Sequence, residues 1–212
     1  MAPYEVANLA HSVETDRLGL QSGIQDQLAS AYGGICYIQM HSYPHASVSQ
    51  LNITEDVWLQ LERRLTLVYI GQPHSSHEVH ERVIARLGAG AATDPRLVAL
   101  RALAADAKAA LYRGDFAAFG RAMDENTEVQ RSLDEHLISP MAEQIMDVGR
   151  SHGAVGCKVN GAGGDGGSVT LLCSGDMVAK RKMLQEISAA GFRIIPLTLS
   201  PQGLRVWSQS RA

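Results

Sequence analysis

One short segment of the chain, residues 159–169, is built largely of glycine. It reads V-N-G-A-G-G-D-G-G-S-V, with five glycines in seven positions, and it lies between two short apolar runs. Glycine loses more conformational freedom on folding than any other residue, so a fold uses many glycines where the backbone turns through positive φ or approaches another group closely. Consecutive backbone N–H groups in such a turn bind anions, most often phosphate. A flexible surface loop or a bulged hairpin is the plainer interpretation of the same residues.

The composition is that of a folded protein. Hydrophobic residues make up 45% of the 212 residues and charged residues 19%, with a net charge of −3. Lysines and arginines are scattered and form no stripe, which argues against a nucleic-acid partner. No apolar run reaches the length of a membrane span. Residues 1–14 lack the pattern of a signal peptide, and the three cysteines are widely spaced. We therefore expect reduced thiols and a cytoplasmic location.

Hydrophobic periodicity and turn residues predict an α+β fold, because runs of helices accompany strands with antiparallel character. Strands are expected at 35–40, 46–53, 65–70, 156–160, 168–173, 193–199 and 204–208. Helices are expected at 3–18, 28–32 and 77–87, then from Pro95 to Gly114, from Asp115 onward, from Pro140 to Gly153 and at 176–190. Leu97, Leu100, Ala104, Ala107 and Leu111 are expected on the inner face of the fourth helix.

Asp26 is a candidate catalytic residue. It stands in the block G-I-Q-D-Q, at the end of a loop punctuated by Gly19 and Gly23. A carboxylate in such a loop can act as a general base on a hydroxyl. The same carboxylate can simply cap the short helix that follows, and the spacing alone favours this second interpretation.

Three further sets of polar residues admit two interpretations each. His74, His77 and His80 lie near acidic residues, but their spacing is not H-E-x-x-H and favours a solvated helix face over a metal site. Ser75 and Ser76 can cap a helix or contact an anion or a sugar hydroxyl. Lys158 precedes the glycine loop on a strand, where it can pair with a phosphate or border the sheet.

Five blocks in a fixed order resemble one family. They are A-N-L-A-H-S-V-E, G-I-Q-D-Q-L-A-S-A-Y-G-G, L-V-Y-I-G, K-V-N-G-A-G-G-D-G-G and G-L-R-V-W. Over residues 3–207 the chain resembles the GHMP kinases (galactokinase, homoserine kinase, mevalonate kinase and phosphomevalonate kinase). Within the family it is most similar to the sugar-kinase branch that includes the heptose-7-phosphate, L-fucose and arabinose kinases.

The resemblance implies a GHMP-kinase-like fold and a kinase activity. Residues 1–55 would be the remainder of an N-terminal α/β domain, and residues 56–212 a C-terminal domain of antiparallel sheet packed with helices. The implied activity is ATP-dependent phosphorylation of a hydroxyl of a sugar or sugar phosphate, with ATP and Mg²⁺ as cofactors. A mevalonate-type acceptor is an alternative from the same family.

The resemblance also implies roles for particular residues. Asp26 matches the carboxylate that faces the acceptor hydroxyl as its base, and Glu14 matches a helix carboxylate that holds Mg²⁺. The residues expected to bind the acceptor are Gly23, Gln25, Gln27, Ser75 and Ser76. The third motif of the family, on the nucleotide and phosphate side, is matched by Gly161, Ala162, Gly163 and Gly164, with Lys158 beside it.

Two departures from the family pattern stand out. Asp165 takes a position where the family usually has glycine, and the P-x-x-x-G-L-G-S-S-A loop that binds ATP phosphates does not occur in the sequence. The chain resembles the C-terminal two-thirds of such a kinase, so we expect a missing N-terminal segment or a partner chain to complete it. Val6, Leu9 and Leu51 are then expected to be exposed, with homo-oligomerisation as one consequence. The alternative is a non-catalytic, partner-dependent subunit that binds sugar or nucleotide.

Overall fold

The structure is a computed structural model that describes residues 1–71, 76–88, 93–161 and 163–207, without the side chains of residues 76–81. The chain divides into two compact units, one formed by Met1–Asn52 with Leu199–Ala212 and the other by Ile53–Thr198. Helices and antiparallel sheets in these units confirm the mixed α+β class. None of the helices described is long and apolar enough to cross a membrane. The domain assignment at 1–55 and 56–212 stays a prediction.

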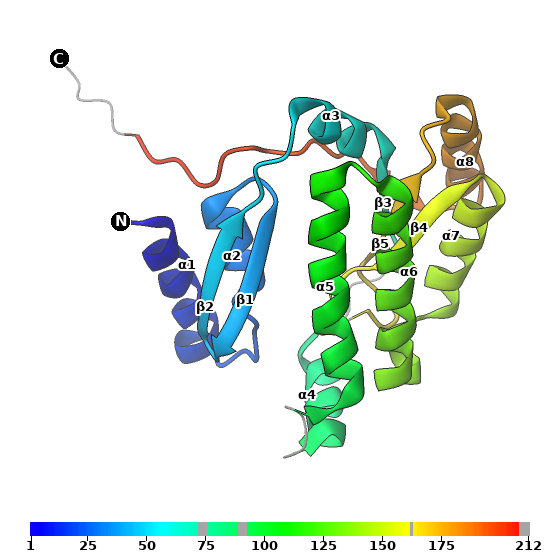
Figure 1. Cartoon of the computed structure of the whole chain (residues 1–212). Helices are drawn as coiled ribbons and strands as arrows, with labels where there is room; N and C mark the ends of the chain where they lie inside the picture. The colour runs from blue at the N-terminus through cyan, green and yellow to red at the C-terminus, as the bar shows by residue number, and fades with distance from the viewer. Residues whose placement is uncertain (72–75, 89–92, 162, 208–212) are drawn as a thin grey trace. The chain divides into compact units, whose positions relative to one another are not determined.

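The first unit is a pair of helices packed on a β-hairpin (Figure 1). Helix α1 spans Pro3–Ser12 and continues as a π-helical turn, Val13–Arg17, and α2 spans Gln25–Tyr32. Strands β1 (Cys36–Ser42) and β2 (His45–Gln50) pair antiparallel. A small apolar core joins these elements, because the helices and the hairpin bury one face each. Its fully or nearly buried members are Ala7, Ile24, Leu28, Ala31 and Ala46.

The last part of the chain returns to the first unit as an extended segment. The N–H of Gly34 donates to the carbonyl of Ser200 at 2.8 Å, and the N–H of Leu204 donates to the carbonyl of Ser30 at 3.1 Å. The approach is so close that a Cβ on Gly33 would lie 2.1 Å from the nitrogen of Gly203. Residues 204–207 are not a strand, so the predicted strand at 204–208 is wrong over this part. Backbone pairing to the end of α2 takes the place of sheet pairing.

The second unit is a four-stranded antiparallel sheet in the order β4-β5-β3-β6, with helices around it (Figure 1). The strands are β3 (Leu65–Tyr69), β4 (Ala154–Val159), β5 (Ser168–Cys173) and β6 (Arg193–Ile195). The helices are α3 (Glu55–Arg64), α4 (Ser76–Leu87), α5 (Pro95–Arg113), α6 (Phe116–Leu133), the short 3₁₀ helix η3 (Glu135–Leu137), α7 (Pro140–Ser151) and α8 (Met177–Ala189).

The core of this unit lies between the sheet and helices α7 and α8. Val68, Val169 and Leu171 from the sheet are completely buried, as are Ile145 and Met146 from α7 and Met183 and Ile187 from α8. Alternate residues of β3 and β5 point to this side, as expected for strands with one face packed on helices. The glycine loop connects β4 to β5, so both of its ends are anchored in the buried sheet.

Helix starts in this unit follow local capping chemistry. The side chains of Asp94, Asp115 and Ser139 each accept a hydrogen bond from a backbone N–H in the first turn of the helix that follows. Such caps stabilise a helix by about 1 kcal/mol each. The predicted starts at Pro95, Asp115 and Pro140 are therefore confirmed.

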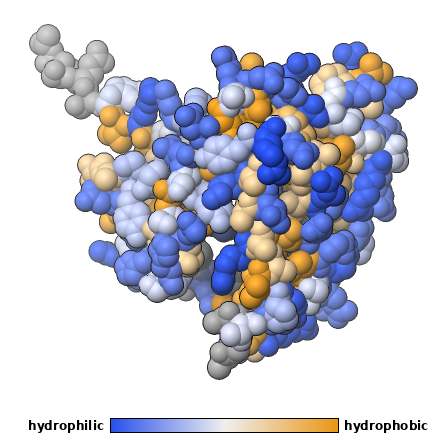
Figure 2. All heavy atoms as spheres, in the orientation of Figure 1, coloured by the Kyte–Doolittle hydropathy of each residue, from blue (hydrophilic) through white to orange (hydrophobic). Residues whose placement is uncertain are grey.

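Helix α5 packs the predicted residues Leu97, Leu100 and Leu111 inward but not Ala104. Leu103, Ala110 and Leu111 are the buried residues of this helix, whereas Ala104, predicted to face inward, is exposed. Figure 2 shows hydrophobic residues gathered along α5, where Val98 is 48% exposed. Alanine is compatible with both faces of a helix, so an alanine-rich sequence determines the buried face weakly.

Exposure of the early apolar residues agrees only partly with expectation. Leu9 is 56% exposed, but Val6 is half-buried and Leu51 is buried. The N–H of Leu51 donates to the carbonyl of Ile35 at 2.8 Å, which holds this residue against the start of β1. The prediction that Leu51 is exposed is therefore wrong.

Candidate functional site

A cavity in the first unit brings together three of the predicted site residues. It has a volume of about 380 Å³ and lies between α1 and α2. Its lining includes Glu14, Asp26 and Gln27, together with small residues of both helices. Because the side chains on the facing sides of the two helices are small, the space between the helices stays open. The polar groups of Glu14, Asp26 and Gln27 are accessible from this space. The cavity therefore combines two carboxylates and an amide with an apolar wall.

Asp26 lies in the first turn of α2, because the helix begins at Gln25 and not at Leu28 as predicted. The N-cap position is taken by Ile24, whose side chain makes no capping hydrogen bond and is completely buried. Asp26 is therefore not the cap of this helix, and its side chain is exposed. A carboxylate in a first turn is stabilised by the helix dipole. The structure places Asp26 where a ligand in the cavity can reach it.

Of the three residues predicted to bind the acceptor around Asp26, one lines the cavity and two do not. Gly23 and Gln25 are exposed and are not among the residues that line the cavity. Gln27 is half-buried and donates from Nε2 to Oε1 of Glu14 at 2.8 Å. Its own Oε1 is buried without a hydrogen-bond donor among the described residues. Gln27 is therefore the predicted acceptor-side residue that the structure joins to the carboxylates.

Glu14 is held in the π-helical turn after α1 and is bound on both oxygens. Oε2 accepts from Oγ of Ser22 at 2.6 Å, and Oε1 accepts from Gln27. These hydrogen bonds, that of Ser22 first, lower the pKa of the Glu14 carboxyl below its usual value. Glu14 is thus ionised at neutral pH and oriented from two sides.

These carboxylates fit the ligand preference of Mg²⁺. The ion takes oxygen ligands and commonly uses one or two protein carboxylates, completing its shell with water and substrate phosphates. Glu14 supplies an ionised carboxylate with a fixed orientation, the Asp26 side chain adds a second carboxyl group to the same cavity, and Gln27 has an amide oxygen without a donor among the described residues. Within the side chains that the structure describes, no group of three or more His, Cys, Asp or Glu residues gathers in metal-binding geometry.

Sequence reasoning missed the residues that hold the loop before Asp26. Nε2 of His11, a buried residue, lies 2.9 Å from Oη of Tyr43 and 3.2 Å from the carbonyl of Ser22. Oη of Tyr43 donates to the same carbonyl at 2.9 Å. Ser22 thus links His11 and Tyr43 to Glu14. The spacing of His11 and Glu14 along one helix was the available signal, but the contact with Tyr43 spans 32 positions.

The glycine loop of the second unit has the backbone that its composition predicts. Gly161, Gly163, Gly164 and Gly167 all have φ between +62° and +86°, a region that other residues rarely adopt. A Cβ on Gly163 would lie 1.9 Å from the carbonyl oxygen of Leu137. Asp165 is exposed. The glycines therefore meet two needs, left-handed backbone and close approach.

Lys158 lies on β4 immediately before this loop. Its Nζ donates to Oε1 of Gln130 at 2.6 Å and to the carbonyl of Val159. An ammonium has three donors, so one remains for another partner. Burial lowers the pKa of the Lys158 ammonium from 10.5 to about 8. Phosphate binding by Lys158 stays a prediction.

This buried ammonium makes the stability of the chain depend on pH. Between about pH 8 and pH 10.5 the unfolded chain holds a proton on Lys158 that the folded chain releases, so the free energy of unfolding rises with pH. The gain is at most about 3 kcal/mol. Lys158→Met should lack this gain. Urea unfolding of both proteins at about pH 7.5 and about pH 10 measures the difference. If the free energy of unfolding changed equally between the two pH values in both proteins, the assignment to Lys158 would be contradicted.

Several predicted residues lie outside the described part of the structure. Ser75 and Ala162 are not described, and neither is His74. Ser76 is the first residue of α4, but its side chain is not described, nor are those of His77 and His80. Their proposed contacts stay predictions.

The chain thus combines a mixed α/β fold, a cavity lined by two carboxylates and a glycine loop between antiparallel strands. Residues 107–191, which include the glycine loop, match the family model for the C-terminal domain of the GHMP kinases. This match agrees with the family that the sequence blocks of the chain resemble.

Relatives of known sequence or structure support this assignment. The chain is 24% identical over 210 residues to the D-glycero-alpha-D-manno-heptose 7-phosphate kinase of Campylobacter jejuni, covering 98% of this chain and 60% of that protein. It is 27% identical over 199 residues to the probable glucuronokinase 2 of Arabidopsis thaliana, covering 93% of this chain and 53% of that protein. The chain thus spans little more than half the length of these relatives.

A solved structure shows the same fold. The crystal structure of a D-glycero-D-manno-heptose 1-phosphate kinase from Bacteriodes thetaiotaomicron matches 98% of this chain and 57% of that protein, with a TM-score of 0.67 and 22% identity. At this identity the match establishes the fold alone. The curated relatives are sugar kinases by name.

Proposed function

We propose that the protein transfers the γ-phosphoryl group of ATP to a hydroxyl of a sugar or sugar phosphate, and that this chain carries the catalytic base. The observation that supports this most is the cavity in which Asp26, Glu14 and Gln27 lie together. The relatives act on heptose phosphate and glucuronic acid by name, which favours a sugar over a mevalonate-type acceptor.

In this mechanism Asp26 accepts the proton of the acceptor hydroxyl as that oxygen attacks the phosphorus. Phosphoryl transfer depends mainly on positioning and on neutralising charge, so one base in reach of the hydroxyl is sufficient acid–base chemistry. Gln27, with Gly23 and Gln25 beside it in sequence, would border the sugar. Glu14 would hold Mg²⁺, which supplies positive charge to the phosphates when bound. Ser22 keeps the Glu14 carboxylate oriented for that role.

On the phosphate side we assign the glycine loop and Lys158. Gly161, Gly163 and Gly164 would shape one wall of the phosphate site, with the N–H groups of Gly163 and Gly164 bound to the carbonyls of Asn160 and Leu137, and Lys158 has one donor left for a phosphate oxygen. Ala162 completes this assignment as a prediction, and Ser75 and Ser76 stay predictions for the acceptor side. The P-x-x-x-G-L-G-S-S-A motif does not occur in these 212 residues. We therefore propose that another segment or a partner chain supplies the main ATP-phosphate loop. The cytoplasmic location remains a prediction.

A phosphoryl-transfer screen of the complete natural protein tests this function. ATP, Mg²⁺ and one acceptor at a time are incubated with the protein, and ³¹P NMR detects a new sugar phosphate. Glucuronic acid, fucose, heptose 7-phosphate and mevalonate are the acceptors. Transfer to at least one sugar is the expected result. Binding of sugar or ATP without any transfer would favour the non-catalytic subunit, and transfer to mevalonate alone would favour the other branch of the family.

A further inference from the structure

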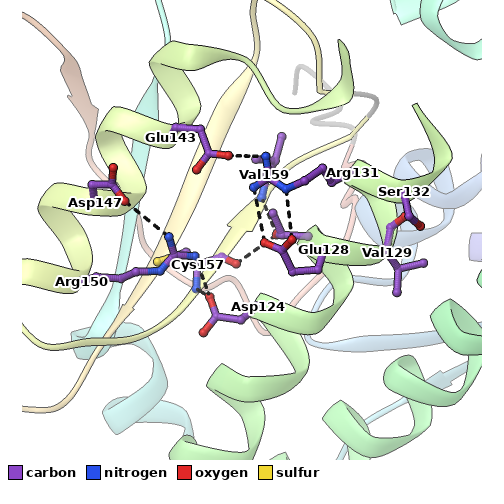
Figure 3. Close-up of polar contacts among 11 residues, drawn as sticks. Asp124, Glu128, Val129, Arg131, Ser132, Glu143, Asp147, Arg150, Cys157 and Val159 are labelled. Atoms are coloured by element: carbon purple, nitrogen blue, oxygen red, sulfur yellow. Dashed lines mark hydrogen bonds and ion pairs between the residues drawn. The ribbon is translucent and has the colours of Figure 1, made fainter. Parts of the chain in front are cut away.

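Two side chains of α6 bind the outer edge of β4. Oδ1 of Asp124 accepts from the N–H of Cys157 at 2.9 Å. Oγ1 of Thr127 donates to the carbonyl of Cys157 at 3.1 Å and accepts from the N–H of Val159 at 3.4 Å. Figure 3 shows Asp124 on α6 beside Cys157 on the strand. Residues three apart lie on one face of a helix, so the next residue in this row is Gln130.

Gln130 extends the row past the end of the strand. Its Nε2 donates to the carbonyl of Gly161 at 3.1 Å, and its Oε1 accepts from Nζ of Lys158 at 2.6 Å. An ammonium can only donate and a carbonyl can only accept, so the chemistry of the two partners determines which end of the amide faces which. One side chain therefore holds the first glycine of the loop and the lysine before it.

The segment that follows α6 holds the middle of the same loop. The N–H of Gly164 donates to the carbonyl of Leu137 at 2.9 Å, and Gly163 lies against that carbonyl too closely for any side chain. Leu137 is the last residue of η3, four residues after the end of α6. The loop is thus attached at two points to one stretch of chain, residues 130–137.

We propose that Gln130 is a positioning residue of the glycine loop, setting the start of the loop and the Lys158 ammonium relative to α6. The functional part of this proposal rests on the phosphate-side role assigned to the loop above. Gln130 would not contact the nucleotide itself. It would act by holding Gly161 and by occupying one donor of Lys158, so that the remaining donor and the backbone of the loop keep a fixed arrangement.

Amide hydrogen exchange tests the positional part without any enzyme activity. Gln130→Met removes both hydrogen bonds and keeps the length of the side chain. The matched control is Gln144→Met, which makes the same change at an exposed position of α7. Exchange at Gly163 and Gly164 should become about 3- to 10-fold faster in the first variant only, with β4 and α6 unchanged. Unchanged loop exchange, or equal acceleration throughout β4, would overturn the proposal.

Steady-state kinetics of the complete natural protein test the functional part. With ATP as the varied substrate, Gln130→Met should raise KM about 3- to 10-fold and change kcat less than about twofold, because the base Asp26 is untouched. Faster loop exchange with an unchanged KM for ATP would overturn the role toward nucleotide. If the unaltered protein transfers no phosphoryl group, the proposed function fails, while the exchange experiment still decides whether Gln130 positions the loop.

Discussion

Replacement of Asp26 by asparagine is expected to lower kcat about 10²- to 10⁴-fold and to change the KM for ATP little. Asparagine has nearly the same shape but cannot accept the proton of the acceptor hydroxyl. The side chain is exposed in the first turn of α2, so the change should reduce stability only by about 0.3–1 kcal/mol through the helix dipole. Initial rates of ADP release with saturating sugar measure the effect.

A matched control for this experiment is Asp16→Asn. Asp16 is an exposed aspartate of the same unit and does not line the cavity that contains Asp26. Its replacement should leave kcat within about twofold of the unaltered protein. Near-normal turnover in the Asp26 variant would remove the base from the mechanism, whereas equal losses in both variants would indicate a general effect on the fold.

Gly120→Ala is expected to destabilise the second unit by about 3 kcal/mol or more, because it adds volume where two backbones touch. A Cβ at this position would lie 2.0 Å from the carbonyl oxygen of Val155, and one on Gly156 would lie 2.4 Å from the Cα of Gly120. No rotamer change relieves a contact with backbone atoms. Helix α6 would have to move away from β4, which breaks the hydrogen bonds of Asp124 and Thr127 as well.

Thermal unfolding measures this effect, with an expected fall in Tm of about 10 °C. The control is Gly149→Ala, another helical glycine. Its added Cβ would lie 3.0 Å and 3.2 Å from the two methyl ends of the flexible Leu171 side chain and 3.5 Å from the Cβ of Ala154, so it would meet no backbone atom at close range. Tryptophan fluorescence can follow the unfolding of the second unit. The chain has two tryptophans, so both variants are made in a Trp207→Phe background, which leaves Trp58 of α3 as the reporter. Similar Tm values for both glycine variants would show that α6 and β4 can separate at little cost.

Local chemistry predicted much of the second unit. Asp115 and Ser139 accept N–H groups at helix starts as their residue types indicate, and the glycine loop adopts the positive φ that its composition requires. The helix at Glu55–Arg64 carries such a signal too, since Thr54 accepts from the N–H of Val57. That cap was visible in the sequence and was overlooked.

Contacts between distant residues could not be predicted in the same way. The start of α2 was placed three residues late because Ile24 is no capping residue, and what fixes it is burial in the core beneath α1. The pairing of Gly120 with Gly156 joins positions 36 apart, and nothing in either local sequence names the other. The same holds for Gln130 and Gly161, whose hydrogen bond depends on how α6 lies along β4.

The row of side chains on α6 also affects how the protein meets other copies of itself. An open strand edge offers unpaired N–H and C=O groups to which another chain can add a strand, and this is a common route to aggregation. At β4 the outward groups of Cys157 and the N–H of Val159 are already bound by Asp124 and Thr127. This edge of the sheet is therefore closed to strand addition by side chains rather than by another strand.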